Sequence, residues 1–134
     1  MHNLKRWAFC LLLLGGCNQE RNKSIEAMNQ GVEAGRQKLF DRAISQLQQA
    51  ISLDASNDQA YYNLGIIYKD QKKPAEAAGA FESAVKYASD NPSYHYELAS
   101  AYLDSKKFEQ ARAEFEQTIK LGPRPTRRTS GSAC

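Results

Sequence analysis

The chain has 134 residues, enough for one folded domain with a modest core and too few for two ordinary domains. Charged residues of both signs make up 25% of it and leave a formal net charge of only +3. Several of the cations lie near the two ends, so the body of the chain is slightly acidic. A basic face that grips the phosphates of a nucleic acid is therefore not expected.

The N-terminal segment has the layout of a secretory signal peptide. Lys5 and Arg6 precede an apolar stretch at 7–14 (WAFCLLLL), and two glycines follow as the small residues of a cleavage site. A membrane-spanning helix needs roughly 20 apolar residues, so this stretch is too short for a permanent span. We expect residues 1–16 to be a leader that is removed.

The residues around Cys17 resemble the lipobox of bacterial lipoproteins. Segment 14–17 (LGGC) has an aliphatic residue, two small residues and the obligatory cysteine. The resemblance implies that the thiol of Cys17 is diacylated, that the leader is cut before it, and that the new amino terminus is also acylated. Two or three acyl chains hold a protein on a membrane stably, whereas one chain binds only marginally. The alternative is an ordinary signal peptide with a cysteine at the cut.

The same resemblance implies a location in a bacterial cell envelope, with residues 17–23 as a polar lipidated tether. In inner-membrane lipoproteins the residue after the cysteine is typically Asp, and here it is Asn18. The resemblance therefore implies an outer-membrane protein that faces the periplasm. That inference depends on the host, and the choice between the two membranes stays open. Cys10 leaves with the leader, so Cys134 is the only free thiol expected, and no internal disulfide can form.

From Ser24 to about Pro123 the sequence repeats with a period of 34 residues. At this spacing five columns agree in size and polarity: Gly31, Gly65 and Ala99; Ala43, Ala77 and Ala111; Leu47, Phe81 and Phe115; Ala50, Ala84 and Thr118; Ile51, Val85 and Ile119. The pattern resembles the tetratricopeptide repeat, a helix-turn-helix unit, and segment 61–68 (YYNLGIIY) matches it best. The resemblance implies an all-α solenoid of three helix-turn-helix repeats, 24–57, 58–91 and 92–125, with about six antiparallel helices.

Helix boundaries are also visible in the sequence. Pro74 and Pro92 suit the first position of a helix, and segment 54–58 (DASND) offers capping residues. Six helices of about 12–14 residues are expected. Small or polar residues replace the aromatic and aliphatic ones of the later repeats in the first helix, which is therefore expected to pack weakly.

The C-terminal end carries no sign of a seventh helix. After Leu121 the chain reads GPRPTRRTSGSAC, and its composition predicts a disordered basic tail at 124–134. Repeat stacks normally end in a polar cap. The last helix could therefore expose an apolar strip, could be covered by a partner or a second copy, or could mark a shortened relative of a longer repeat protein.

No motif for catalysis is present in the sequence. There is no cluster of Cys and His at metal-ligand spacing, no glycine-rich phosphate loop and no nucleophile motif, so no enzyme, metal or cofactor is expected. His95 shares a column with Ala27 and Tyr61, which indicates a packing role. Glu114 and Glu116 are interpreted as part of a solvated helix face.

The family resemblance implies a concave groove lined by the first helix of each repeat. The predicted partner-binding residues in it are Asn29, Val32, Tyr62, Asn63, Ile66 and Tyr96. Some family members clamp a C-terminal carboxylate with two asparagines and basic residues, but here Ser93 and Glu97 stand where the cations are needed. An extended or amphipathic peptide held by aromatic anchors is expected instead. The alternative is that the two tyrosines only serve the packing of the repeat.

These features predict a lipid-anchored adaptor or scaffold that binds a protein or peptide partner at a bacterial membrane, in the assembly of an envelope complex. The alternative is a structural or regulatory subunit that packs through its exposed terminal helices into an oligomer or a larger complex. A third hypothesis, an enzyme of cell-wall metabolism, is supported only by the expected location in the cell envelope. No nucleic acid and no small-molecule substrate is expected as a partner.

Overall fold

The computed structural model describes the backbone of residues 4–123 and the side chains of Gly16 and 18–123. This part of the chain is helical and contains no strand. The predicted basic tail, with Cys134, lies outside the described residues. The helices are α1 (Leu4–Arg36), α2 (Phe40–Leu53), α3 (Asp58–Asp70), α4 (Pro74–Tyr87), α5 (Pro92–Asp104) and α6 (Phe108–Leu121).

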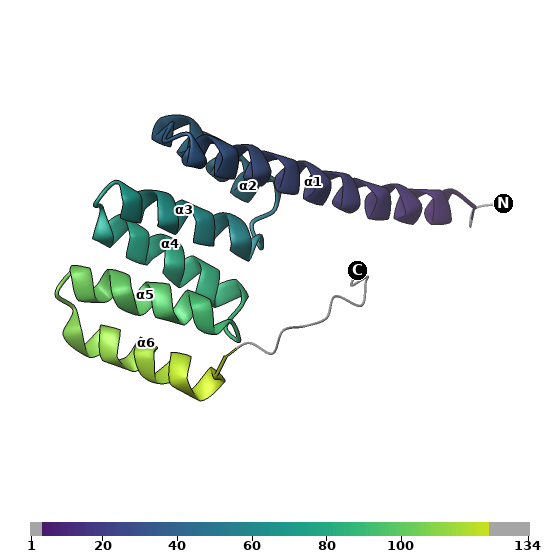
Figure 1. The fold of residues 1–134 in the computed structure, drawn as a ribbon. Coiled ribbons are helices and arrows are strands. Elements are labelled where there is room, and N and C mark those ends of the chain that lie inside the picture. The colour runs from purple at the N-terminus through teal and green to yellow at the C-terminus, as the bar shows by residue number, and fades with distance from the viewer. Residues whose placement is uncertain (1–3, 124–134) are drawn as a thin grey trace.

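The helices form three antiparallel pairs that stack in chain order, α1 with α2, α3 with α4 and α5 with α6 (Figure 1). The turns within the pairs lie along one edge of the stack. The loops at 54–57 and 88–91, which join one pair to the next, lie along the opposite edge, and α1 projects beyond the stack on that side (Figure 1). The predicted all-α solenoid of three helix pairs is confirmed.

The helix starts follow from local side-chain chemistry. Pro74 and Pro92 occupy the first turns of α4 and α5, where a missing N–H leaves no hydrogen bond unmade. The side chain of Asn57 accepts a hydrogen bond of 3.0 Å from the N–H of Ala60 and caps α3. Asn91, at the equivalent position of the next repeat, accepts one of 3.1 Å from the N–H of Ser93. Each cap satisfies an amide at the helix start that has no partner within the helix.

The turn after the first helix of each pair contains a lysine in the left-handed conformation. These three capping lysines, Lys38, Lys72 and Lys106, have φ of 58°, 61° and 62°. The next amide reaches back over the last helical turn in each case, for example from the N–H of Leu39 to the carbonyl of Ala34 at 2.9 Å. Glycine is the usual residue at such a cap, because a side chain there costs roughly 1–2 kcal/mol.

The core is built from the columns that repeat every 34 residues. Ala43, Leu47 and Ala50 on α2 are fully buried, and so are Ala77, Phe81 and Ala84 on α4. The same columns on α6 are less protected, because the described chain has no further helix beyond it. Ala111 is buried, but Phe115 and Thr118 are only partly buried.

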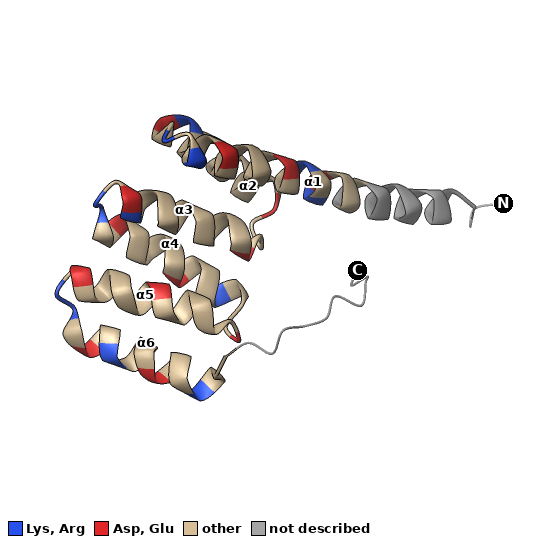
Figure 2. Ribbon diagram, in the orientation of Figure 1, with Lys and Arg blue, Asp and Glu red and all other residues tan. Residues whose placement is uncertain are grey.

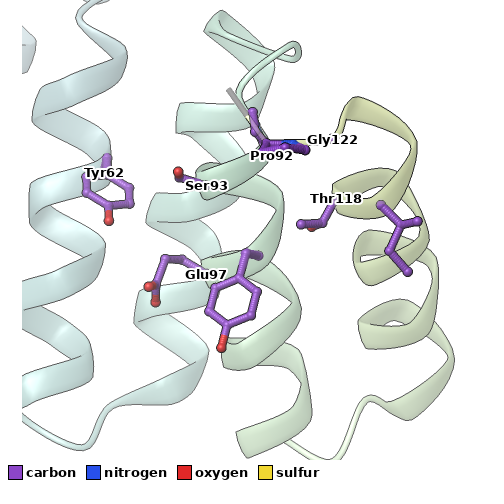
Figure 3. Close-up of a pocket in the computed structure, with 9 residues that line it drawn as sticks. Tyr62, Pro92, Ser93, Glu97, Thr118 and Gly122 are labelled. Carbon is purple, nitrogen blue, oxygen red and sulfur yellow. The ribbon is translucent and has the colours of Figure 1, made fainter. Parts of the chain in front are cut away.

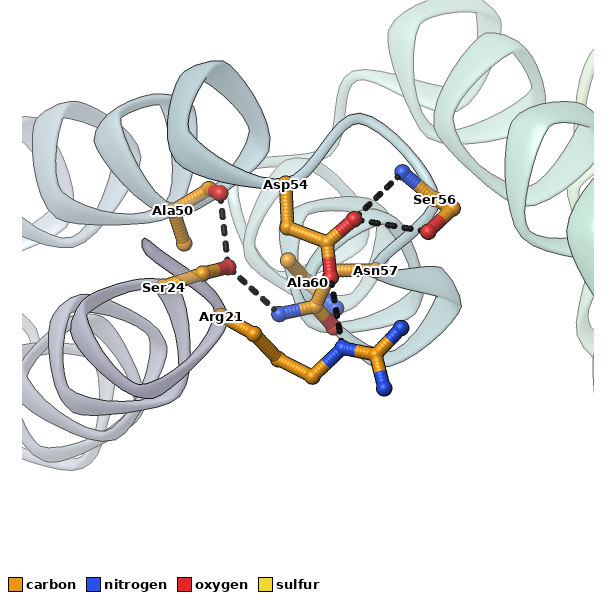
Figure 4. Close-up of polar contacts among 7 residues, drawn as sticks. All are labelled: Arg21, Ser24, Ala50, Asp54, Ser56, Asn57 and Ala60. Carbon is orange, nitrogen blue, oxygen red and sulfur yellow. Dashed lines mark hydrogen bonds and ion pairs between the residues drawn. The ribbon is translucent and has the colours of Figure 1, made fainter. Parts of the chain in front are cut away.

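Helix α1 is fixed to the stack by small residues and by a polar network. Ser24 is fully buried, and its hydroxyl donates a 2.7 Å hydrogen bond to the carbonyl of Ala50 (Figure 4). The amide of Asn57 donates to the same hydroxyl at 3.0 Å, and Arg21 lies 3.8 Å from the carboxylate of Asp54. The helix expected to pack weakly is thus held to both α2 and the start of α3.

Helix α1 is longer than the sequence pattern predicts. It continues without a break from Leu4, so residues 17–23, expected to be a tether, are helical in this structure. The side chain of Cys17 lies outside the described ones, and its lipidation stays a prediction. Within the part of the chain that is described, no helix has the length and hydropathy of a membrane-spanning segment.

His95 packs inside the third pair, as its column predicts, but it does so through a polar contact. The ring is 6% exposed, with Nδ1 2.6 Å from a carboxylate oxygen of Glu114 and Nε2 2.8 Å from the carbonyl of Ser89. The interpretation of Glu114 as part of a solvated face is therefore wrong, because this side chain turns inward to a buried partner. Glu116 is exposed and pairs with Arg112 on its own helix at 3.1 Å.

The glycine at position 65 allows α3 and α4 to approach closely, and Gly65→Ala tests this. A Cβ atom at Gly65 would lie 2.5–2.8 Å from ring atoms of Phe81, which is fully buried and has no room to move. Overpacking of this kind costs roughly 1–3 kcal/mol. We expect Gly65→Ala to lower the free energy of unfolding by that amount in denaturant titrations.

Gly79→Ala is the matched control. Gly79 is exposed in the interior of α4, and an added Cβ would meet nothing within 4 Å. Because alanine favours the helix, this change should raise the free energy of unfolding by about 0.5–1 kcal/mol. Equal effects of the two substitutions would contradict the close approach at Gly65.

Candidate partner-binding groove

Two hollows lie along the surface formed by the first helices of the pairs. The larger, of about 610 Å³, lies between α3, α5 and the end of α6 (Figure 3), and we call it the tyrosine hollow. It is lined by Tyr62, Pro92, Ser93, Tyr96, Glu97, Thr118, Ile119, Gly122 and Pro123. A smaller hollow of about 180 Å³, the α1–α3 hollow, is lined by Val32, Gly35, Arg36, Leu47, Asn63, Ile66, Ile67 and Asp70.

The structure brings five of the six predicted groove residues to these two hollows. Tyr62 and Tyr96 line the tyrosine hollow, whereas Val32, Asn63 and Ile66 line the α1–α3 hollow. Three of the five lie on α3, which borders both hollows, and we call the surface that contains the two hollows the groove. The amide of Asn63 donates a 2.8 Å hydrogen bond to the carbonyl of Gln59 on its own helix.

Asn29, the sixth predicted residue, is not placed with the others. It is exposed and lines a separate hollow with Glu26, Glu33 and Arg42, between α1 and α2. The two asparagines that resemble a carboxylate clamp in the sequence therefore line different hollows.

The two groove tyrosines differ in how free they are to meet a ligand. Tyr62 is half-buried, and its ring stacks on Tyr94 with centroids 4.9 Å apart and lies 5.8 Å from Phe81. Tyr96 is 53% exposed and touches Phe115 through an edge-on contact with centroids 5.8 Å apart. Tyr62 is thus part of the core as well as of the floor of the hollow, and Tyr96 is the aromatic ring open to a ligand.

The charge of Glu97 is matched by a cation from the preceding repeat. The ammonium of Lys69 lies 2.7 Å from a carboxylate oxygen of Glu97, whose side chain is 16% exposed. This hydrogen bond raises the pKa of Lys69. Burial, and next the negative charge of Glu97, raise the pKa of Tyr62, which stays a neutral hydroxyl donor at neutral pH.

The tyrosine hollow therefore presents a ligand with aromatic and apolar walls, the hydroxyl groups of Tyr62, Ser93, Tyr96 and Thr118, and one paired carboxylate. None of its lining residues is Lys or Arg. Among the residues the structure describes, no group of three His, Cys, Asp or Glu side chains could hold a metal ion. These walls suit an apolar or aromatic side chain better than an acidic one.

Sequence reasoning missed the part of this site that α6 provides. Thr118, Ile119 and Pro123 border the hollow, although the groove was assigned to the first helix of each pair alone. Gly122 makes this possible, because its φ of 68° ends α6 and turns the chain toward the hollow. A glycine and a proline directly after the last periodic residue were the signal in the sequence.

Comparison with known proteins agrees with this architecture. A family model described as tetratricopeptide repeat matches residues 28–92 and 66–125. No curated protein sequence matches the chain.

Several solved structures share the fold at low sequence identity. The TPR domain of Arabidopsis OM64 has a TM-score of 0.72 and 19% identity over 80% of this chain and 88% of that one. The first TPR of Spaghetti (RPAP3), bound to the HSP90 peptide SRMEEVD, has a TM-score of 0.73 and 22% identity over 79% and 84%. PilF of Pseudomonas aeruginosa has a TM-score of 0.67 and 24% identity over 76% of this chain and 47% of its own.

These similarities concern the fold, and the chain spans about half the length of PilF. The family model itself covers most of the sequence, from the first helix pair to the end of α6. The chain belongs to the tetratricopeptide repeat family.

Proposed function

We propose that this protein is a lipid-anchored adaptor that holds an extended or amphipathic segment of a partner protein in its groove, at a bacterial membrane. The observation that carries the proposal is the tyrosine hollow, an open cleft of about 610 Å³ with a half-exposed aromatic ring at its centre. Aromatic anchors of this kind supply most of the binding energy in protein interfaces. The repeat family to which the chain belongs forms protein-interaction scaffolds, and structural neighbours bind peptides.

The chemistry of the hollow favours an apolar anchor residue in the bound segment. The peptide held by the RPAP3 repeats, SRMEEVD, carries three acidic residues. The tyrosine hollow of this chain has no cation among its lining residues to receive such a peptide. An apolar side chain seated between Tyr96 and Ile119, with its backbone bonded to Ser93 or Thr118, fits the walls better.

Tyr96→Ala tests the groove. We expect this change to weaken binding of the partner by about 2 kcal/mol, roughly 30-fold, because it removes the exposed anchor ring. The partner is first identified by cross-linking to the lipidated protein, and the affinity is then measured with the purified pair. Tyr62→Ala is less suitable, because Tyr62 also packs against Tyr94 and would affect the fold.

Tyr87→Ala is the matched control for this experiment. Tyr87 is 41% exposed at the end of α4 and stacks on Tyr61, outside the groove. Its removal should leave the affinity for the partner unchanged. A partner that binds Tyr96→Ala as tightly as the wild type would contradict the proposed site.

The lipid anchor at Cys17 is proposed on the lipobox, and the outer membrane facing the periplasm is the proposed location. The direction of α1 supports the anchor, because the N-terminal part of this helix projects beyond the edge of the stack (Figure 1). The contact between Ser24 and Asn57 fixes the helix only seven residues later in the chain.

Labelling with radioactive palmitate tests the anchor. The wild-type protein should incorporate the label and fractionate with membranes, and Cys17→Ala should do neither, because it removes the thiol that is acylated. Cys134→Ala is the control and should be labelled like the wild type. Equal labelling of Cys17→Ala and the wild type would refute acylation at this residue.

The alternative, a subunit that packs through its last helix, draws support from Phe108, which is 61% exposed on α6. The outer face of α6 nevertheless differs from that of α4. Ala78 on α4 is 3% exposed and belongs to the cluster shared with α5, whereas the equivalent residue on α6 is Arg112, which pairs with Glu116. This charged pair is typical of a terminal cap, whereas Phe108 and Ile119, which are 61% and 78% exposed, leave apolar surface on the same helix.

Phe108→Asp distinguishes the adaptor from a subunit that packs through its last helix. If the protein acts as an adaptor, this change should leave both the oligomeric state in light scattering and the affinity for the partner unaltered, since Phe108 lies outside the groove. Phe115→Asp is a poorer choice because Phe115 packs against Tyr96. Loss of an oligomer or complex on Phe108→Asp alone would favour the alternative.

A further inference from the structure

The three capping lysines occur at one position of the repeat, each 34 residues after the last. Each follows the last turn of α1, α3 or α5 and takes the left-handed conformation that favours glycine. All three are exposed. A lysine with a strained backbone therefore occupies the same position in each of the three turns within the pairs.

Folding alone does not account for these lysines. A cation near a helix C-terminus interacts favourably with the partial negative charge there, and this offsets part of the strain. The same benefit is available from a lysine in the last helical turn, where no strain arises, with glycine left at the cap. Strained residues that a fold does not require point to a role outside the fold.

The short turns within the pairs differ in charge from the loops that join one pair to the next. Segments 37–39, 71–73 and 105–107 contain five lysines and no acidic residue, and we call these five, Lys38, Lys72, Lys73, Lys106 and Lys107, the lysine ridge. The loops at the opposite edge, 54–57 and 88–91, contain Asp54 and Asp90 and no cation. Figure 2 shows basic residues at the turns within the pairs, with acidic residues on the helix ends beside them, and acidic residues at the loops between the pairs.

The ridge lysines make no ion pair within the described chain, although the ammonium of Lys107 lies 5.7 Å from the centre of the Tyr102 ring. Asp70 and Asp104 end the helices just before two of the turns, but neither is paired with a ridge lysine. Beside Lys72 is a hollow of about 320 Å³ that Lys69, Pro74, Ala101 and the acidic Asp104 also line.

We propose that the lysine ridge is a second interaction surface, which binds an acidic polypeptide segment that runs along the edge of the stack. Each turn within a pair carries at least one ridge lysine. A segment with several acidic residues can therefore place a carboxylate next to a lysine at each successive turn. The ridge is separate from the tyrosine hollow, whose lining residues include no lysine. The two surfaces therefore recognise opposite chemistries, an apolar anchor in the groove and acidic residues at the edge.

An anionic lipid surface fits the ridge less well. This step rests on the proposed anchor, which lies at the far end of α1 from the ridge. At a rise of roughly 1.5 Å per residue, Cys17 and the end of α1 are separated by about 30 Å along the helix axis. Electrostatic attraction fades over a Debye length of about 8 Å at physiological salt, so an anchored chain keeps its ridge away from the bilayer.

The test uses poly-L-glutamate as the probe and the full chain with Cys17→Ser, so that acylation plays no part. We expect the wild-type ridge to bind it in a salt-dependent manner. Replacing all three capping lysines, with Lys38→Gly, Lys72→Gly and Lys106→Gly, should weaken binding about tenfold. The melting temperature should not fall, because glycine relieves the left-handed strain.

The control removes three lysines near the opposite edge, with Lys23→Gln, Lys86→Gln and Lys120→Gln, and should keep the affinity within a factor of about two. A second ridge variant, Lys73→Gln with Lys107→Gln, leaves the caps intact and should also weaken binding. Tyr96→Ala should have no effect, which separates this surface from the groove.

Three results would overturn the proposal. One is that the wild-type chain does not bind poly-L-glutamate at all. Another is an equal loss of affinity for poly-L-glutamate in the ridge and control variants, which would show that only the net charge of the chain matters. The third is binding to vesicles of anionic phosphatidylglycerol that is stronger than binding to poly-L-glutamate. This binding would have to depend on the ridge lysines and be absent with vesicles of neutral phosphatidylcholine.

Discussion

The close approach of the two helices within each pair is the constraint on which the rest of the structure depends. In the central pair it is set by Gly65, whose missing side chain leaves room for the ring of Phe81. The first pair uses the same device with Gly31 and Leu47. Dense packing at these points fixes the angle within each pair, and identical pairs then stack on one another through faces that have the same shape.

The groove follows from that stacking. Because each pair repeats the geometry of the last, the outward face of α3 and that of α5 lie side by side and carry Tyr62 and Tyr96 to one hollow. The ion pair between Lys69 and Glu97 joins the same two helices and removes an uncompensated charge from the groove. The hollow therefore offers mainly aromatic and apolar contacts, and the proposed binding of an apolar anchor residue rests on them.

Much of the fold could be predicted from the sequence because its main determinants are local and periodic. The column of Gly31 and Gly65, and the prolines at 74 and 92, predict pairing and helix starts from residue type and spacing alone. The capping lysines were not foreseen, because the usual mark of such a cap is glycine and none stands there. Lysine in this position carries no signal that distinguishes it from an ordinary surface residue.

The site was less predictable because it depends on contacts between repeats. The partners Lys69 and Glu97 are close only when α3 and α5 are stacked, and the inward turn of Glu114 needs the position of His95. Asn29 shares a repeat position with Asn63, but it lines a hollow between α1 and α2 instead. Repeat position therefore predicted which residues line the hollows for five of the six and did not predict their neighbours.

The central claim is that a partner segment lies in the tyrosine hollow, and photo-cross-linking in living cells tests it most directly. A photoreactive amino acid is placed at Ser93, which is exposed and lines the hollow, or at Ser45, which is exposed on α2 away from it. The account predicts one discrete cross-linked partner from position 93 and none from position 45. Cross-links from position 45 but not from position 93 would contradict it.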